Sequence, residues 1–421
     1  MPIASLDTFR ARGSARFRAG LVLARGAGWL SRAAGTGTGT ALAGRVLQAV
    51  SPDCLSEAAT GLECVLVSAT NGKTTTTAMV AAALGTGYQV VSNSLGNNMT
   101  AGIAEALSHR GGATHAAIEV DEAHLPLVME STRPVAVVLM NLSRDQLDRV
   151  SEVRKVADRW REAIAAHPEC TVVANVADPM VAYAVENADR LVAVELPPGW
   201  RLDATVCPRC DTPLAFTETT FACPNCGFAS PGAPWHLRAG VLAGPGGLAV
   251  TLSTALPGAF NLANAAMAVV LAAALGLDPQ SAADAISAIA EVKGRFARTR
   301  VGEREVTLLM AKNPAGWQAT VAMLAGDRRP VVLSINAEIA DGKDTSWLYD
   351  VDFTPLASRQ VIACGRRRHD LSTRLGYDGV AHLCMDDEME AIAACHGAEV
   401  VFVGNYTAFQ GMRKRIARGH G

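Results

Sequence analysis

The chain has 421 residues, with 38 basic and 40 acidic side chains and a formal charge of −2. This length exceeds one ordinary core and predicts two or three domains. The balanced charge argues against a general nucleic-acid binder. The sequence has no uninterrupted apolar run of about 18 residues, so no membrane span is predicted.

The N-terminal 60 residues form a predicted basic extension. Within the first 50, seven arginines face a single acid, Asp7, and apolar residues such as Trp29 and Leu30 are interleaved with them. Two interpretations are open: a solvated helix packed on the body of the protein, which we favour, or a helix lying on an anionic membrane surface. The segment lacks the apolar core of a secretory signal.

Residues 65–77 predict a phosphate-binding loop between a strand and a helix. Gly72 lets backbone N–H groups close on phosphate oxygens, Lys73 neutralises phosphate charge, and Thr74 offers a hydroxyl to Mg²⁺. Val67 stands where the full pattern has its first glycine, so a plain strand-to-helix turn is the alternative. The predicted ATP-binding residues of this loop are Thr70, Asn71, Gly72, Lys73, Thr74 and Thr75.

Apolar strands are predicted at residues 89–92, 116–120, 135–139 and 171–174, with helical stretches between them. This alternation predicts a parallel sheet covered on both faces, which binds ligands at the carboxyl ends of its strands. Glu119 and Asn141 follow two strand ends, and we predict that both contact the nucleotide site. Glu119 is suited to hold Mg²⁺; the alternative is that it caps the next helix.

Four of the ten cysteines form a zinc-ligand pattern. Cys207 and Cys210, then Cys223 and Cys226, make two Cys-x2-Cys knuckles in a segment of changed composition, residues 201–235. Four thiolates leave no open coordination position, so we predict a structural Zn²⁺ site. A redox dithiol pair is the alternative. The other six cysteines are scattered, which predicts reduced thiols in the cytoplasm.

Residues 256–296 supply further predicted nucleotide contacts. Asn261 and Asn264 lie three apart at the start of an Ala-rich helix, where their amides could read a base edge. Capping of that helix explains Asn261 equally well. Arg295 is predicted to reach a phosphate.

Residues 299–421 predict a second, smaller α/β unit, with strands at 306–310, 331–335, 360–363 and 400–403. Between two of these strands lies a segment with four aspartates, which is interpreted as either a Mg²⁺ site or a solvated acidic turn. These acids are Asp341, Asp344, Asp350 and Asp352.

In order and spacing, the motifs resemble the central ATPase domain of the Mur ligase family over about residues 60–298. Mur ligases phosphorylate a carboxylate with ATP and let an amine attack the acyl phosphate. The resemblance implies a central P-loop ATPase domain (61–298) with an inserted zinc ribbon (201–235), followed by a Rossmann-like α/β C-terminal domain (299–421). The matching segments are Ala69–Thr75, Ile118–Val120, Asp145–Asp148, Asn175–Pro179, Gly258–Asn264 and Gly294–Phe296.

Departures from the common pattern are similar to the MurT branch of this family. Gln146 stands where Mur ligases usually have His, and no lysine for a carbamoylated metal bridge occurs between Lys155 and Lys293. The zinc knuckles also interrupt a region where ordinary Mur ligases have none. The segments 344–353 and 406–408 resemble the MurT C-terminal pattern.

The MurT resemblance implies an enzyme that pairs with a GatD-type glutaminase as a heterodimer. Such a pair is a lipid II isoglutaminyl synthase, which uses ATP, Mg²⁺ and glutamine to amidate the α-carboxyl of D-glutamate in the stem peptide during peptidoglycan synthesis. Lys73 and Glu119 would act at the ATP step, and Asp344 or Asp350 would orient the partner's histidine. We expect the protein in the cytoplasm near the inner face of the membrane, with peripheral membrane contact.

Two other functions fit parts of the sequence. A stand-alone ligase of the Mur or folylpolyglutamate type would share the fold, but the missing bridging lysine counts against it. A P-loop protein that binds nucleic acid through its zinc ribbon is disfavoured because Arg209 is the one basic residue between Cys207 and Cys226.

Overall fold

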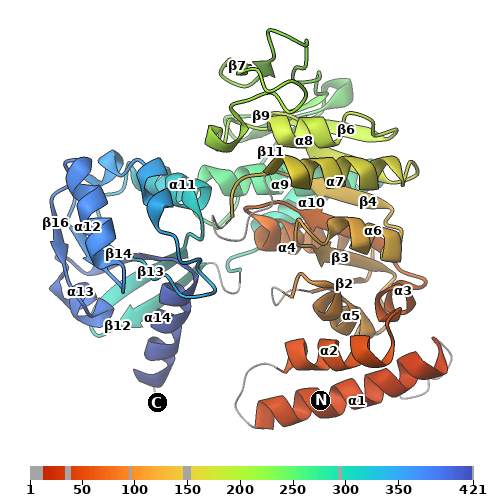
Figure 1. Ribbon diagram of the computed structural model, residues 1–421, viewed down its shortest axis with the longest axis horizontal. Helices are drawn as coiled ribbons and strands as arrows, with labels where there is room; N and C mark the ends of the chain where they lie inside the picture. Colours follow the sequence, from red (N-terminus) through yellow and green to blue (C-terminus); the bar gives the residue numbers. More distant parts are fainter. Residues whose placement is uncertain (1–12, 34–38, 94–96, 146–152, 293–295, 420–421) are drawn as a thin grey trace.

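The computed structural model describes residues 13–33, 39–93, 97–145, 153–292 and 296–419 (Figure 1). Its largest sheet has nine strands in the order β11-β10-β9-β6-β5-β4-β1-β3-β2. Within this sheet the seven strands β9, β6, β5, β4, β1, β3 and β2 are parallel, and β10 and β11 add an antiparallel edge beyond β9. The bounds are β1 Glu63–Ser68, β2 Val90–Ser92, β3 His115–Glu119, β4 Ala136–Leu139, β5 Thr171–Asn175, β6 Leu191–Glu195, β9 Trp235–Arg238, β10 Val241–Ala243 and β11 Ala249–Thr251.

Both faces of this sheet are buried under helices, and successive side chains of a strand point into opposite layers. Val65 and Val67 of β1 belong to one hydrophobic cluster, whereas Cys64 and Leu66 belong to another. The first cluster is covered by α4 (Lys73–Leu84), α9 (Ala259–Ala274) and α10 (Pro279–Ser287). The second is covered by α3 (Cys54–Ala59), α5 (Thr100–Ser108), α6 (Leu125–Thr132), α7 (Val153–Ala165) and α8 (Pro179–Ala184).

Three helices begin at an Asx-Pro pair. Asp178, Asp278 and Asn313 each accept backbone N–H bonds from the first turn of the helix that follows. Such side chains satisfy N–H groups that have no partner within the helix, and proline at the first position removes one of those groups. The sequence therefore sets the starts of α8, α10 and α11 (Pro314–Leu324) locally.

A six-stranded sheet follows in the order β12-β13-β17-β14-β15-β16, antiparallel between β12 and β13 and otherwise parallel. One of its faces packs against α13 and α14, while the residues of the other face join the hydrophobic cluster of the large sheet. The bounds are β12 Phe296–Val301, β13 Arg304–Met310, β14 Val331–Ser334, β15 Val361–Cys364, β16 His382–Cys384, β17 Glu399–Gly404, α12 Arg368–Tyr377, α13 Glu388–Ala394 and α14 Tyr406–Gly419, with the 3₁₀ turns η4 Ser346–Asp350 and η5 Thr354–Leu356.

Two smaller parts lie at opposite ends of the large sheet (Figure 1). One is the hairpin of β7 (Ala215–Phe216) and β8 (Phe221–Ala222), next to the 3₁₀ turn η2 (Leu202–Ala204); a further turn, η3 (Pro245–Gly247), joins β10 to β11. The other is the helix pair α1 (Ala15–Ala33) and α2 (Thr40–Val50), which packs on α5. One face of α1 is packed on the body, as we favoured; residues 1–12 lie outside the described ranges.

Most predicted strands of both sheets are present within one or two residues of their expected ends. The parallel α/β fold class is confirmed, whereas the domain limits at 60, 298 and around the insert stay predictions. β6, the β9–β11 edge, β12 and β16 were not expected. None of the helices in the described ranges is long and apolar enough to span a bilayer.

Candidate active site

The turn between β1 and α4 has the backbone geometry of a phosphate-binding loop. Gly72 has φ of 89°, which a residue with a side chain rarely adopts. A Cβ on Gly72 would lie 2.9 Å from Oδ1 of Asn264, in α9. The N-terminus of α4, which carries the partial positive charge of a helix start, follows directly at Lys73.

Lys73 is buried, and its ammonium group is fully engaged beside the loop. Its Nζ donates to the carbonyl oxygen of Ala69 and lies 2.6 Å from Oε2 of Glu122. Burial disfavours the charged amine, but Glu122, Asp145 and Glu119 outweigh that effect and raise the pKa of Lys73. The lysine is therefore charged and close to where phosphates would lie.

Glu119 stands at the end of β3, facing the first turn of α4. The Thr74 hydroxyl donates to its Oε1 over 3.1 Å. Asn93 fixes the Glu119 backbone by donating to its carbonyl over 2.8 Å and accepting from its N–H over 2.7 Å. Asn98 approaches the Glu119 carboxylate at 3.4 Å. This pair of a hydroxyl and a carboxylate suits Mg²⁺, which prefers hard oxygen ligands.

Asn141, at the end of β4, ties the loop to the sheet. Its side chain accepts from Asn71 N–H over 2.9 Å and donates to the Asn71 carbonyl over 3.0 Å. The Thr70 hydroxyl in turn bonds the backbone of Ser143. Asn141, Thr70 and Asn71 therefore shape the loop through bonds within the protein, and Thr75 is buried in α4.

Asn261 and Asn264 lie together but are both buried. Asn264 donates to Oδ1 of Asn261 over 3.1 Å, and Asn261 donates to the Pro257 carbonyl over 2.6 Å. The second bond favours a local structural role for Asn261 over base reading, and Asn264 lies against Gly72. Arg295 and residues 146–148 of the predicted site lie outside the described ranges.

Two ion pairs join the site region to the C-terminal sheet. Lys312, which follows β13, lies 2.5 Å from Asp145. Arg144 contacts both Asp203 and Asp350, the latter at 2.9 Å. Burial raises the pKa of Asp145, but Lys312 and then Lys73 lower it more, so the net pKa lies below its ordinary value. These charges connect segments more than 150 residues apart in the sequence.

The four aspartates of the C-terminal segment each have a different hydrogen-bond or ion-pair partner. Asp341 is buried and accepts from the Thr407 N–H and hydroxyl, and Asp350 pairs with Arg144. Asp344 is exposed and accepts from Ser346 N–H over 2.8 Å, a bond that lowers its pKa. Asp352 accepts from Thr354 N–H. The arrangement favours the acidic turn over a Mg²⁺ site.

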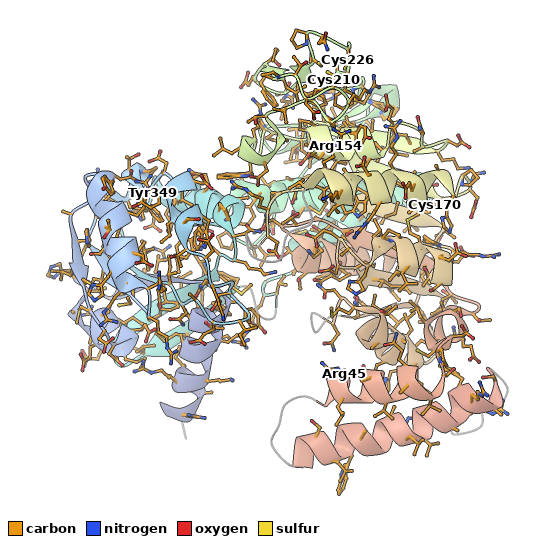
Figure 2. All side chains as sticks on the ribbon, viewed as in Figure 1. Arg45, Arg154, Cys170, Cys210, Cys226 and Tyr349 are labelled. Atoms are coloured by element: carbon orange, nitrogen blue, oxygen red, sulfur yellow. The ribbon has the colours of Figure 1, made fainter. Side chains whose placement is uncertain are left out.

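The four knuckle cysteines lie together near the β7–β8 hairpin (Figure 2). Their sulfur atoms are all within 4.8 Å of one another, and the pairs Cys207–Cys226 and Cys210–Cys223 are 3.5 Å apart. Tetrahedral Zn²⁺ with bonds of about 2.3 Å requires sulfurs roughly 3.8 Å apart, so the cluster fits zinc. Within the described ranges it is the one group of three or more potential ligands placed this closely.

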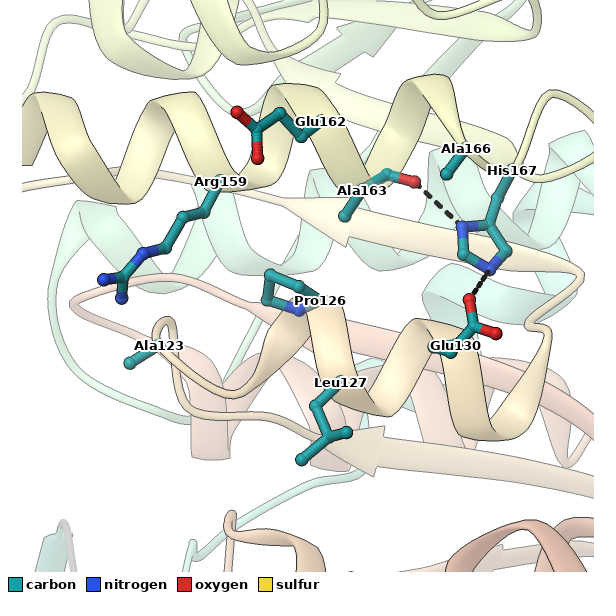
Figure 3. Close-up of a pocket in the computed structure, with 9 residues that line it drawn as sticks. All are labelled: Ala123, Pro126, Leu127, Glu130, Arg159, Glu162, Ala163, Ala166 and His167. Atoms are coloured by element: carbon teal, nitrogen blue, oxygen red, sulfur yellow. Dashed lines mark hydrogen bonds and ion pairs between the residues drawn. The ribbon is translucent and has the colours of Figure 1, made fainter.

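A separate cavity of about 450 Å³ opens between α6 and α7 (Figure 3). Its rim includes Leu127, Arg159 and Glu162. The Nδ1 of His167 donates to the Ala163 carbonyl over 2.8 Å, and its Nε2 lies 3.8 Å from Glu130. None of the predicted site residues lines it. Concavity alone therefore does not mark the nucleotide site in this fold.

Sequence reasoning missed several residues of this region. No role was predicted for Glu122, Asn93 or Lys312. The segment 93–98, with three asparagines between a strand and a helix, was the available signal for Asn93. Lys312 had no such signal, because it meets Asp145 only through the tertiary fold.

The fold is that of the Mur ligases. It matches a pseudomurein peptide ligase type C from Methanothermus fervidus with a TM-score of 0.68, at 18% identity over 85% of this chain and 79% of that one. It also matches MurF from Acinetobacter baumannii with a TM-score of 0.64, at 17% identity over 90% and 80%. The Mur ligase middle domain family matches residues 67–194, and the MurT ligase C-terminal family matches residues 310–409.

Relatives that align with most of this chain identify the branch of the Mur ligases to which it is similar. The chain is 31% identical over 371 residues to the lipid II isoglutaminyl synthase (glutamine-hydrolyzing) subunit MurT of Streptococcus pneumoniae, covering 82% of this chain and 83% of that one. It is 30% identical to the Staphylococcus aureus subunit of the same name, over 82% and 84%. The chain belongs to the MurT family of Mur ligases.

Proposed function

We propose that this protein is the ATP-dependent synthase subunit of a lipid II isoglutaminyl synthase. It would convert the α-carboxyl of D-glutamate in the lipid II stem peptide to an amide, using ammonia from a GatD-type glutaminase in a heterodimer. The observation that carries the proposal is the convergence of Lys73, Thr74 and Glu119 at one strand edge in a chain of the MurT family. We infer that it works in the cytoplasm, where ATP and glutamine are supplied.

The local chemistry supports phosphoryl transfer. The ATP phosphates would lie on the Gly72 turn, with Lys73 against their charge, and Thr74 and Glu119 would hold Mg²⁺, which neutralises negative charge on the phosphates. The substrate carboxylate attacks the γ-phosphorus and ADP leaves. Ammonia then attacks the acyl carbon, phosphate leaves and a proton is lost. Lys73 must exchange Glu122 for phosphate oxygens, so Glu122 marks the resting position of the lysine.

The C-terminal unit offers a surface for the partner subunit. Asp344 is exposed, and so are the rings of Tyr349 in η4 (Figure 2) and Tyr377 in α12, whose centroids lie 6.0 Å apart. Tyrosine is enriched at protein interfaces. Because Asp350 is neutralised by Arg144, we propose Asp344 as the acid that orients the partner's histidine.

Amidation of lipid II with purified partner, glutamine and MgATP tests the proposal. Lys73→Met should lose activity because the phosphates lose their buried cation, whereas Lys414→Met, on the exposed face of α14, should keep it. Equal activity of Lys73→Met and wild type would reject the assignment. ATP turnover stimulated by a free amino acid without the glutaminase would instead support a stand-alone ligase.

A further inference from the structure

The helix α1 lies at the edge of the molecule (Figure 1), and several of its large apolar side chains are exposed. Phe17, Leu21 and Ala24 are buried against the rest of the protein. On the opposite side Val22, Leu23, Trp29 and Leu30 are exposed by 68, 55, 63 and 60%. Four large apolar side chains on one helix exceed the scattered single exposures that are normal on a surface.

The stripe has basic borders. At about 100° of rotation per residue, the four side chains cover an arc of roughly 120° on the helix. Arg18 and Arg25 fall at one border of this arc and Arg16 at the other, and all three are exposed. Neither α1 nor α2 contains an acidic residue. An apolar stripe that contains Trp and has arginines at its margins is typical of helices that lie in a membrane interface.

We propose that this stripe docks on an anionic lipid bilayer, with Val22, Leu23, Trp29 and Leu30 inserted at the headgroup boundary and the arginines against lipid phosphates. A protein partner would have to place acids opposite the arginines at both margins of the stripe. The bilayer satisfies both features with one surface, because anionic headgroups attract the basic margins and the acyl region takes the apolar centre.

The helix pair α1 and α2 is connected through α5 and the segment before it to the predicted nucleotide site. Gly44 of α2 packs so closely on α5 that a Cβ there would clash with the Ala101 carbonyl. Asn97 donates to Thr40 at the start of α2 over 2.8 Å, and its neighbour Asn98 contacts Glu119. A bilayer under α1 would therefore hold the strand edge with Glu119 near lipid-linked substrate. This consequence rests on the proposed function; docking itself does not.

Vesicle binding tests docking without any substrate. The full chain should co-sediment with vesicles containing anionic phosphatidylglycerol, and much less with pure phosphatidylcholine. Trp29→Ser with Leu30→Ser should bind about tenfold or more weakly, since two inserted apolar side chains are lost. Arg18→Ser with Arg25→Ser should bind roughly 30-fold more weakly at low salt. Leu383→Ser and Arg300→Ser, at similarly exposed positions of the C-terminal sheet, are matched controls.

The outcomes separate docking from catalysis. Unchanged vesicle binding in the Trp29/Leu30 variant, with unchanged thermal unfolding, would overturn the proposal. The proposal would also be overturned if the protein does not bind vesicles and instead dimerises, or binds its glutaminase, through this stripe. If docking is right, the variant has a raised KM for lipid II in vesicles and an unchanged KM for a water-soluble stem-peptide substrate. If the wild-type protein amidates neither substrate, the proposed function is refuted. The vesicle-binding result would still decide whether the stripe docks on a bilayer.

Discussion

At the scale of single residues, the nucleotide turn depends on one glycine and one lysine. Gly72 combines a positive φ with a tight approach to Asn264, so a side chain there meets both backbone strain and a clash. Lys73 is the buried cation of the turn, and its charge is maintained by three carboxylates. We therefore expect replacement of either residue to impair the turn.

Gly72→Ala should abolish most ATP binding, measured by calorimetry, because the loop must shift to clear Asn264. The matched control is Gly61→Ala, where φ is 74° and a Cβ would meet nothing within 4 Å. Gly61→Ala should cost about 1–2 kcal/mol of stability from backbone strain alone and leave ATP affinity unchanged. Equal loss of ATP affinity in both variants would show that strain, and not the Asn264 contact, is responsible.

Asp344→Asn should remove glutamine-dependent amidation, because the partner's histidine loses its orienting acid. Amidation driven by added ammonium chloride should persist, since the ATP site is untouched. Asp350→Asn is the comparison, and it should affect both nitrogen sources alike through Arg144. If Asp350→Asn instead shows the selective loss, the assignment of the two acids is reversed.

At the scale of elements, we expect the β7–β8 hairpin to depend on Zn²⁺ held by the four knuckle cysteines. β7 and β8 are two residues each, and a hairpin this small is marginal without a staple. Cys223→Ser should lose bound zinc, measured as about one equivalent per chain in wild type, and expose the hairpin to protease. Cys384→Ser, an exposed thiol outside the cluster, is the control. Retention of full zinc by Cys223→Ser would exclude the four-thiolate site.

Helices and strands could be predicted where the local sequence determines their position. β1, β3 and β4 are continuous apolar runs, and Asx-Pro pairs mark the starts of α8, α10 and α11. The edge strand β16 is short and largely exposed, so it has no strong apolar pattern. In the site, motif spacing indicated Lys73, Thr74 and Glu119, but the partnership of Glu122 with Lys73 depends on side-chain direction. The spacing of residues in a motif does not give side-chain direction.

At the scale of the whole molecule, charge pairs join the nucleotide edge of the large sheet to the C-terminal sheet. Lys312→Met removes the pair with Asp145 and should lower the free energy of unfolding by about 1 kcal/mol or less at neutral pH, since both side chains are partly exposed. Because Asp145 has a lowered folded pKa, its contribution is present above the unfolded value of about 3.9 and lost as pH falls through the folded pKa.

Urea unfolding of wild type and Lys312→Met across this acidic range checks the sign. The difference between the two proteins should be largest near neutral pH and should shrink below about pH 4. A difference that grows on acidification would contradict the lowered pKa of Asp145.

The central claim is that this chain activates a lipid-linked carboxylate with ATP and passes it to ammonia from a partner. The most direct measurement is isotope transfer in the assembled pair, using lipid II whose glutamate carboxylate carries heavy oxygen and glutamine with a heavy amide nitrogen. The account predicts that one heavy oxygen appears in inorganic phosphate for each heavy nitrogen that enters the product amide. Amide formation with no heavy oxygen in phosphate, or phosphate release without amide, would contradict it.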